Sequence, residues 1–449
     1  MNLAYVIASV LYFALVVGAG LCAAKGETRE EFLIGARQYN ALLLAASIGA
    51  SWISAGGLMI IFNMISTDLT TLVSIELGFA LSLTLLAFIA PRLRQLAIQH
   101  EAYSMTELVE KLIGKRFALL VAFFLFVIYS GWLLLELVGT AQLLASFSGW
   151  AYEIVVLVLT TVIAVYLWAG GFQALMRTDF LQAIFIGVLF LTFFVLPDHL
   201  QFPDLHTFGA GQSFSFPAAV GGLAIGIIST FCGAEIWQRA IAARSGRDGK
   251  KGLLWAALTL LLASLFLWYV AFGIYQAYPE ASPATYLSLL SGAVPSWFAP
   301  LLFVCLMALV MSTLDTAGFV AAQTLMNDGI YKLTGKEVEH PQRILRIGIL
   351  VTFLASAGLA MVFRDVIEIL YFLFAYWGLL TPALFVFLTK SPPSEKSLII
   401  SVLLGFIGIT GLQIAGVYQD WMNVFTIAGL LILPPVLDRA RGKTYRVQA

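Results

Sequence analysis

The stretch from residue 45 to residue 62 reads AASIGASWISAGGLMIIF and decides how this chain is expected to fold. It is apolar like a membrane span, but small residues and glycines crowd its middle. Residues 219–239, AVGGLAIGIISTFCGAEIWQR, have the same character. Unwound backbone at membrane depth is tolerated only where it is buried in protein or lines a cavity. We therefore predict two broken helices beside a cavity, whereas the alternative is ordinary packing of small residues between intact helices.

The whole chain has the composition of a membrane protein. Of its 449 residues, 61% are hydrophobic and 11% are charged, and the mean hydropathy is +0.94. A soluble domain carries roughly 25% charged residues, so this composition excludes one, together with disordered and nucleic-acid-binding proteins. A bilayer core needs about 20 apolar residues per helix. Thirteen stretches qualify, at 2–22, 41–63, 70–91, 117–146, 150–170, 178–198, 217–238, 252–276, 296–326, 343–363, 365–389, 397–416 and 420–437.

The basic residues predict an orientation for these spans. On the thirteen-span topology, 24 of the 25 Lys and Arg residues fall on one side, and only Arg364 falls on the other. Because cytoplasmic loops carry the excess of Lys and Arg, the N-terminus is predicted outside and the C-terminus in the cytoplasm of a cell-membrane protein. The first span has no Lys or Arg before it and is therefore expected to be retained rather than cleaved as a signal peptide.

The two predicted broken helices are the second and seventh spans. Since they lie five spans apart, spans 2–6 and 7–11 are predicted to form a five-plus-five inverted repeat in an all-α polytopic membrane protein. We expect the two repeats at residues 41–198 and 199–389. Residues 1–40 would form an extra N-terminal helix and a loop, and residues 390–449 would form extra helices and a short tail. Glycine-interrupted segments at matching places in two repeats mark the midplane binding site of a transporter. The sequence has no GxxxxGK[ST] motif, so ATP is not expected to drive it.

Acidic residues inside the apolar spans point to a cation. Ionisable groups in a span are costly and usually functional, and no Lys or Arg is expected deep in any span. Uncompensated carboxylates need a cation or a proton. The alternative to a functional role is that Asp179 and Glu235 are solvated near the interface and that Glu136 is protonated and hydrogen-bonded to a neighbouring helix. Ser312, Asp315 and Thr316 share one helical face, and their oxygens suit a small hard cation. The acidic residues are Glu76, Glu136, Asp179, Glu235 and Asp315.

Four segments together resemble the sodium:solute symporter family. Residues 31–37, EFLIGAR, are similar to the family's lead-in to its first core helix, although Ala36 is an insertion-like departure. Residues 170–182 match the pattern GG…A…TD..Q, the most specific of the four. Residues 238–243, QRAIAA, resemble the stretch after the second broken helix. Residues 311–313, with 327–332, resemble the start and end of the sodium-binding helix. The resemblance implies a leucine-transporter-like core and a transporter rather than an enzyme.

The resemblance also implies where Na⁺, the coupling ion, binds. The main site would use backbone carbonyls of Ala50, Ile53 and Leu309 with the hydroxyls of Ser312 and Thr313. A possible second cation site would use Asp179, Asp315 and Thr316, where Asp315 departs from the family's usual hydroxyl. In sugar-carrying members a Gln of the broken helix precedes an acid by 19 residues. Glu76 holds the place of that acid, but Gly57 replaces the Gln, which argues against a sugar.

The predicted substrate pocket combines carboxylates and aromatic rings, which suit an amine or a quaternary ammonium group. We therefore predict sodium-coupled import of a small organic solute, preferably an amine, amino acid or other zwitterion, by alternating access. The partners would be this small molecule and the lipid bilayer. The alternatives are a proton-coupled transporter on the same fold and a nutrient-sensing membrane receptor without flux. The predicted pocket residues are Trp52, Gly57, Glu76, Tyr129, Trp132, Glu136, Glu235 and Trp237.

Overall fold

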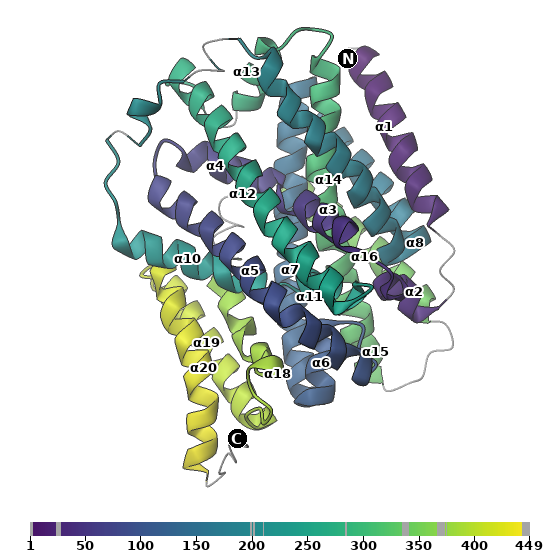
Figure 1. Ribbon diagram of the computed structural model, residues 1–449, viewed down its shortest axis with the longest axis vertical. Coiled ribbons are helices and arrows are strands. Elements are labelled where there is room, and N and C mark those ends of the chain that lie inside the picture. The colour runs from purple at the N-terminus through teal and green to yellow at the C-terminus, as the bar shows by residue number, and fades with distance from the viewer. Residues whose placement is uncertain are drawn as a thin grey trace.

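The computed structural model describes an all-helical chain (Figure 1). It describes residues 3–23, 28–197, 200, 203–209, 211–282, 285–334, 341–365, 373 and 375–441. The long helices run roughly along one common direction, with α1 at one edge and the α19–α20 pair at the other (Figure 1). The longer elements are α1 (Leu3–Cys22), α3 (Ala41–Trp52), α4 (Ala55–Met64), α5 (Leu69–Gln99), α7 (Lys115–Ser148), α8 (Tyr152–Leu189), α10 (Phe216–Phe231), α11 (Ala234–Ala242), α12 (Gly246–Ala277), α14 (Ala299–Gln323), α16 (Pro341–Val362), α19 (Glu395–Ile414) and α20 (Asn423–Ala440).

The helices account for the predicted membrane spans. Within the described residues, nine helices are long and apolar enough to cross a membrane, and two bent pairs raise this number to eleven. The predicted spans 150–170 and 178–198 both fall within α8. The predicted span 365–389 lies partly outside the described residues, and its described part contains the shorter apolar helix Ala375–Leu388. The all-helical polytopic fold is thus confirmed, while the division into repeats at 41–198 and 199–389 stays a prediction.

Helix α8 is two spans joined at a sharp bend. Gly171 has φ 54° and ψ −136°, a backbone conformation open to glycine and strained for other residues. The hydroxyls of Tyr166 and Thr178, on either side of this bend, lie 2.7 and 3.3 Å from the same oxygen, Oδ2 of Asp315. A straight helix would separate these two residues by about 18 Å. The chain therefore folds back at Gly171, as two separate spans require.

Both predicted broken helices are confirmed. Helices α3 and α4 meet at an angle of 55°, and α10 and α11 meet at 43°. The first break is fixed locally because Ser54 begins a new helix: its hydroxyl accepts a hydrogen bond from the backbone N–H of Gly57 at 2.8 Å. At the second break, Gly233 is the residue before α11 and has an extended conformation. The small residues in these spans thus mark two points where the backbone leaves the helical path.

Helix α10, the first half of the second broken helix, packs closely against α5. A Cβ atom on Gly226 would lie 2.2 Å from the carbonyl oxygen of Ile75, and one on Gly78 would lie 2.7 Å from that of Leu223. Glycine on both helices therefore lets the two backbones touch, as in other small-residue crossings within membranes. Helix α12 also packs on α5, and these helices form one wall around the breaks.

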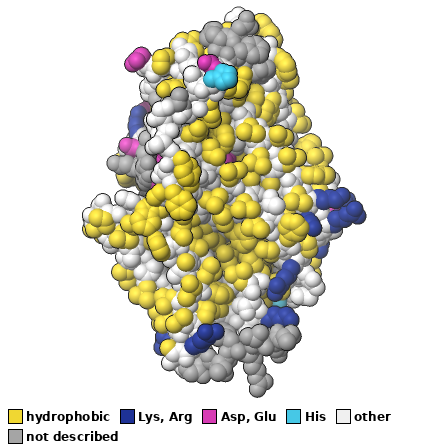
Figure 2. All heavy atoms as spheres, turned by 60° about the vertical axis from the view of Figure 1, so that its left-hand side comes forward, with side chains coloured by type: hydrophobic (Ala, Val, Ile, Leu, Met, Phe, Trp, Pro, Cys, Tyr) yellow, Lys and Arg dark blue, Asp and Glu magenta, His cyan; other side chains and the backbone are white. Residues whose placement is uncertain are grey.

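Helix α14 occupies the centre of the bundle. In the most apolar stretch of this span 94% of the residues are buried, whereas in the corresponding stretches of α1 and α20 only 22% and 17% of the residues are buried. Figure 2 shows a broad belt of hydrophobic side chains on the outer surface, with most of the visible Lys and Arg side chains toward one end. A belt of this kind suits contact with lipid tails. A span buried from all sides, such as α14, is by contrast placed to carry a site.

Candidate functional site

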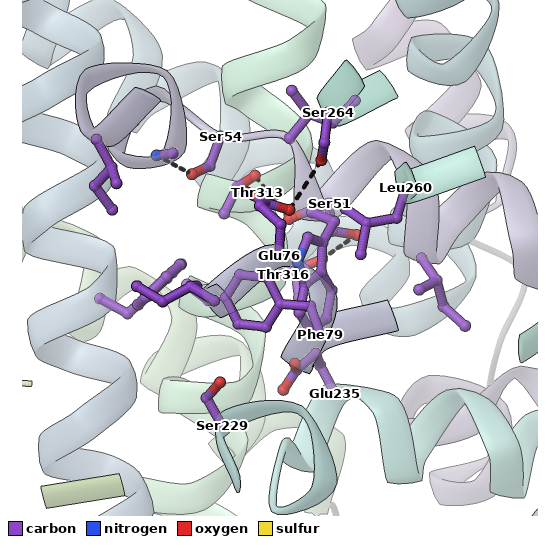
Figure 3. Close-up of a pocket in the computed structure, with 18 of the residues that line it drawn as sticks. Ser51, Ser54, Glu76, Phe79, Ser229, Glu235, Leu260, Ser264, Thr313 and Thr316 are labelled. Atoms are coloured by element: carbon purple, nitrogen blue, oxygen red, sulfur yellow. Dashed lines mark hydrogen bonds between the residues drawn. The ribbon is translucent and has the colours of Figure 1, made fainter. Parts of the chain in front are cut away.

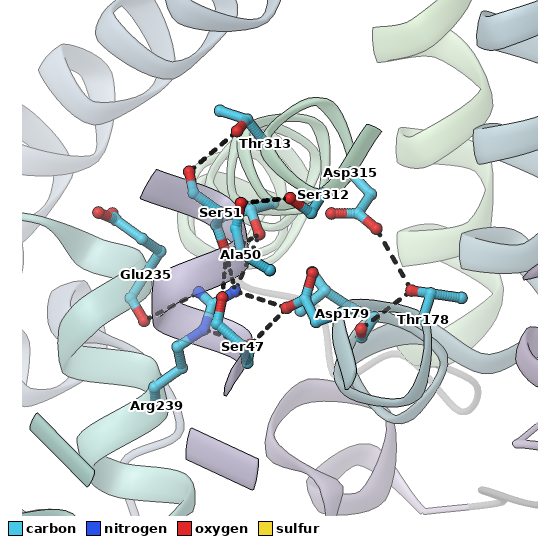
Figure 4. A network of polar contacts seen from close by, with 12 residues as sticks. Ser47, Ala50, Ser51, Thr178, Asp179, Glu235, Arg239, Ser312, Thr313 and Asp315 are labelled. Atoms are coloured by element: carbon cyan, nitrogen blue, oxygen red, sulfur yellow. Dashed lines mark hydrogen bonds and ion pairs between the residues drawn. The ribbon is translucent and has the colours of Figure 1, made fainter. Parts of the chain in front are cut away.

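The end of α3 lies against the middle of α14. The hydroxyl of Ser312 donates to the carbonyl oxygens of Ala50 at 2.5 Å and of Leu309 at 3.2 Å. The hydroxyl of Thr313 donates to the carbonyl oxygen of Ser51 at 2.9 Å. Because α3 stops at Trp52, the carbonyls of its last turn have no continuing helix to bond. Four of the five residues predicted for the main sodium site, Ala50, Leu309, Ser312 and Thr313, are thus brought together. Figure 4 shows Ala50, Ser312 and Thr313 at this junction.

Ile53, the fifth residue of that predicted site, is the hinge between the two half-helices. Its backbone is extended, with φ −83° and ψ 104°, so its carbonyl does not take part in a regular helix. Carbonyl and hydroxyl oxygens are hard ligands of the kind that small alkali and alkaline-earth cations prefer. The junction of α3 and α14 has the donor chemistry for Na⁺, although sodium binding there stays a prediction.

The residues predicted for a second cation site surround an arginine instead. The Arg239 guanidinium is 1% exposed and forms an ion pair with the fully buried Asp179, with 3.0 Å between Nη2 and Oδ2. The same nitrogen donates to the hydroxyls of Thr316 and Ser51, each at 2.9 Å, and Nε donates to the hydroxyl of Ser47 at 2.7 Å. Figure 4 shows the guanidinium pointing from α11 toward this cluster. The expectation that no Lys or Arg lies deep in a span is therefore wrong.

The physical reason for this correction is the course of α11. The charges of 239–251 suggested a loop that begins at residue 239, but α11 continues to Ala242 after the break. Arg239 therefore lies on a helix packed against α3, α5 and α14. Its charge compensates Asp179, which is not the uncompensated carboxylate that the sequence suggested. A buried ion pair of this kind is costly to break because one partner then remains charged and unpaired.

Asp315 lies on the other side of the same cluster. Its Oδ2 accepts hydrogen bonds from Tyr166 and Thr178, both in α8. Its Oδ1 and the Oδ1 of Asp179 are buried and have no hydrogen-bond partner among the described residues. The three residues predicted for the second site, Asp179, Asp315 and Thr316, are thus close together in one polar network. This network offers two bare carboxylate oxygens beside an arginine.

A cavity lies between the two breaks and is bordered by α3, α4, α5, α7, α11, α12 and α14 (Figure 3). Its wall is mostly apolar and carries a small number of polar groups, which is typical of a site for a small molecule. Six of the eight residues predicted for the substrate pocket line it: Trp52, Gly57, Glu76, Tyr129, Trp132 and Glu235. The cavity also borders the predicted cation sites through Ser51, Thr313, Thr316 and Arg239.

Two predicted pocket residues do not line the cavity. Glu136 is fully buried beneath the start of α4, where its Oε2 accepts a hydrogen bond from the backbone N–H of Gly56 at 3.2 Å. Trp237 is also fully buried; it donates from Nε1 to the carbonyl oxygen of Phe231 at 2.9 Å and packs on the ring of Phe387. Both residues lie on helices that are buried on several sides, so their neighbours could not be chosen from the sequence pattern.

The two glutamates of the cavity are held by hydroxyl groups. Ser264 donates to Oε2 of Glu76 at 2.8 Å, and the Tyr129 hydroxyl donates to Oε2 of Glu235. The same Tyr129 oxygen accepts a hydrogen bond from the backbone N–H of Ala234 at 3.0 Å. The two carboxylates therefore reach the cavity from different helices, α5 and α11 (Figure 3). Each is fixed in place without being neutralised by a described cation.

Several residues of the site were missed by the sequence analysis. Aromatic rings of Phe79 and Trp377 extend the wall beside Trp52 and Tyr129, with ring centroids 5.0 and 5.7 Å apart in the two pairs. Arg239 and Ser264 supply polar partners. Only Arg239 had a signal, because it follows Glu235 by four residues and so shares its helical face. The others lie on apolar spans whose faces look alike in the sequence.

The fold and the site define a class: a polytopic helical membrane protein with two broken helices around a central cavity. Residues 32–200 match the model of the Sodium:solute symporter family. This is the family that its sequence motifs resemble, and the match covers the first part of the chain. A search of curated proteins found no match.

Two solved structures share this fold. A Na⁺-coupled sialic acid symporter, in a substrate-bound outward-open state with what is described as a novel Na⁺ site, matches with a TM-score of 0.83 at 16% identity, covering 97% of this chain and 98% of that chain. Mhp1, a nucleobase-cation-symport-1 family transporter in a closed conformation with bromovinylhydantoin bound, matches with a TM-score of 0.60 at 14% identity, covering 91% and 94%. At these identities the likeness establishes the leucine-transporter-like fold.

Proposed function

We propose that this protein uses the sodium gradient to import a small organic solute, an amine, amino acid or other zwitterion, by alternating access. The observation that carries the proposal is the junction of α3 and α14, where the Ser312 and Thr313 hydroxyls meet carbonyl oxygens at the end of a broken helix. An ion at this junction would be coordinated by both helices at once. It would therefore stabilise one arrangement of α3 against α14.

The same end of α3 forms part of the cavity wall through Ser51, Trp52 and Ile53. Sodium that fixes this segment would also fix the groups that meet the solute. Solute and ion would then bind cooperatively from outside and leave together on the cytoplasmic side, where sodium is scarce. The membrane potential adds about 2.3 kcal/mol per elementary charge for every 100 mV. No covalent step is needed for such transport.

Sodium binding is testable before the solute is known. Thermal unfolding of the purified protein is compared in NaCl and in KCl at equal ionic strength and fixed pH. A ligand of the folded state at ten times its Kd adds about 1.4 kcal/mol of stability, so the melting temperature should be higher in NaCl and should follow the sodium concentration. Equal melting temperatures in the two salts would speak against the main sodium site.

Transport itself is tested in proteoliposomes. Currents or uptake are recorded with panels of amines, amino acids, sugars and short carboxylates, under an inward sodium gradient at equal pH on both sides. Sodium-driven accumulation of one class supports the proposal. Accumulation driven by a pH gradient alone would favour the proton-coupled alternative, and ligand binding without flux would favour the receptor.

A further inference from the structure

Each broken helix resumes beside a carboxylate of the protein itself. Glu136 reaches the start of α4, where its Oε2 accepts a hydrogen bond from the N–H of Gly56. A Cβ atom on Gly56 would lie 2.8 Å from the other oxygen of Glu136, so glycine at this position lets the carboxylate approach. Glu235 lies in the first turn of α11. Both helix starts that follow a break therefore carry a built-in acid.

A helix N-terminus is the natural place for a substrate carboxylate in a membrane site. Its unpaired N–H groups and its partial positive charge attract anions, and transporters with discontinuous helices use them in this way. Here the N–H groups of α4 are already engaged: Gly56 bonds Glu136, and Gly57 bonds the Ser54 hydroxyl. An acidic substrate group at either helix start would meet a like charge instead of a free donor.

The cavity wall supplies the opposite charge preference. Glu76 and Glu235 line it, and the one described basic side chain in its lining, Arg239, is bonded to Asp179 and to three hydroxyls. The ring pairs Trp52–Phe79 and Tyr129–Trp377 stand in the same region. Carboxylates and aromatic faces together attract an ammonium group. Among the described lining residues, the acidic and aromatic groups favour a cation, and the basic group is already engaged by Asp179 and the hydroxyls.

We propose that the transported solute is an organic cation that carries an amine or quaternary ammonium group and no carboxylate. This inference rests on the proposed function and narrows it, because it removes amino acids and other zwitterions. The ammonium group would pair with a cavity glutamate, and the apolar remainder would lie against the isoleucine and leucine side chains of the wall. These are Ile48, Ile53, Ile60, Ile61, Leu72, Ile75, Ile236, Leu260 and Leu267.

The test uses pairs of compounds that differ by one carboxylate: phenethylamine and phenylalanine, isoamylamine and leucine, tetramethylammonium and glycine betaine. Each is titrated against the purified full-length protein in NaCl by thermal unfolding and against proteoliposomes by solid-supported-membrane currents. We expect at least one amine to act at a concentration at least tenfold lower than its carboxylated partner, and no pair to show the reverse. A carboxylated member that acts as well as its amine, or a panel in which no amine acts, overturns the inference.

Variants connect this preference to the two helix starts. Glu136→Gln keeps an oxygen that can accept from Gly56 but removes the charge, so the tenfold preference for the amine should fall to threefold or less. Glu153→Gln, at an exposed glutamate bonded to Arg364, should leave the preference unchanged. If Glu136→Gln does not fold, Glu235→Gln is expected to reduce the same preference. An unchanged preference in the folded variant refutes the assigned role.

Failure of this inference is distinguishable from failure of sodium coupling. The thermal titrations of each pair are repeated in KCl, where no sodium is bound, so that the preference within a pair is measured with and without the coupling ion. Amine preference without a sodium effect would refute the proposed function and keep the substrate class. A higher melting temperature in sodium, together with binding of the carboxylated compounds, would keep the proposed function and refute the substrate class.

Discussion

Removal of one hydroxyl from α14 should weaken sodium binding without unfolding the protein. Ser312→Ala deletes the group that lies 2.5 Å from the Ala50 carbonyl, and Thr313→Val deletes the one that lies 2.9 Å from the Ser51 carbonyl. Both hydroxyls are buried and lie between α3 and α14. Each variant therefore removes one proposed ligand and leaves the apolar packing of α14 nearly intact.

The size of the effect follows from the charge of the ion. A hydrogen bond to a charged group contributes about 1.5–3 kcal/mol, and the loss of one ion–oxygen contact in a buried site is taken to be of the same order. Since about 1.4 kcal/mol corresponds to a tenfold change in affinity, one lost hydroxyl should raise the half-saturating sodium concentration by about 10- to 100-fold. The same range is expected for both variants, because each of them removes one hydroxyl and keeps the other.

The assay is a sodium titration of uptake or current at fixed solute concentration and fixed pH. Ser401→Ala is the matched control: its hydroxyl is equally buried, and among the described residues it bonds only the carbonyl of Ser397 within α19, at 2.8 Å. Thr313→Ser retains a hydroxyl and should restore most of the affinity. Unchanged sodium dependence in both Ser312→Ala and Thr313→Val, in folded protein, would refute the assignment of the main site.

Three further predictions concern the helices around the site. Gly226→Ala should destabilise the protein by about 1–3 kcal/mol, because the new Cβ would lie 2.2 Å from a backbone oxygen of α5. The control in thermal unfolding is Gly408→Ala, whose new Cβ would meet nothing within 4 Å. Equal stability of the two variants would contradict the tight crossing of α10 and α5. Arg239→Gln should cost about 3–5 kcal/mol by leaving Asp179 unpaired, and the double variant with Asp179→Asn should recover part of this loss, whereas strictly additive losses would contradict the ion pair. Asp315→Asn should change the charge moved per solute more than the half-saturating solute concentration, as the ratio of current to uptake will show; a change in affinity alone would place Asp315 in the solute site instead.

The two breaks could be predicted from the sequence because glycine and serine act locally. Ser54 caps the new helix α4 through a residue three positions away, and Gly233 precedes α11 directly. Such contacts join residues that are close in the sequence, so the local sequence is enough to predict them. The junction of α3 with α14 joins segments that are distant in the chain, and it was predicted only through the family resemblance.

The position of Arg239 could not be predicted in the same way. A cluster of basic residues after an apolar span normally marks the cytoplasmic end of that span. In this chain the span breaks before its end, and the remaining short helix carries its first arginine back into the bundle beside Asp179. Glu136 and Trp237 show the other limit of sequence reasoning. Where a helix is buried all round, hydrophobic periodicity does not indicate which face meets a cavity.

One residue at the end of α3 connects the three parts of the site. The carbonyl oxygen of Ser51 accepts from Thr313 in the proposed sodium site, and its hydroxyl accepts from Arg239 at 2.9 Å and from Thr316 at 3.3 Å. Ser51 also lines the cavity. A cation at the junction would compete with the Thr313 hydroxyl for this end of α3, so its binding and the arrangement of the cavity wall cannot be independent. Linkage then requires reciprocity: if sodium raises the affinity for the solute, the solute raises the affinity for sodium by the same factor.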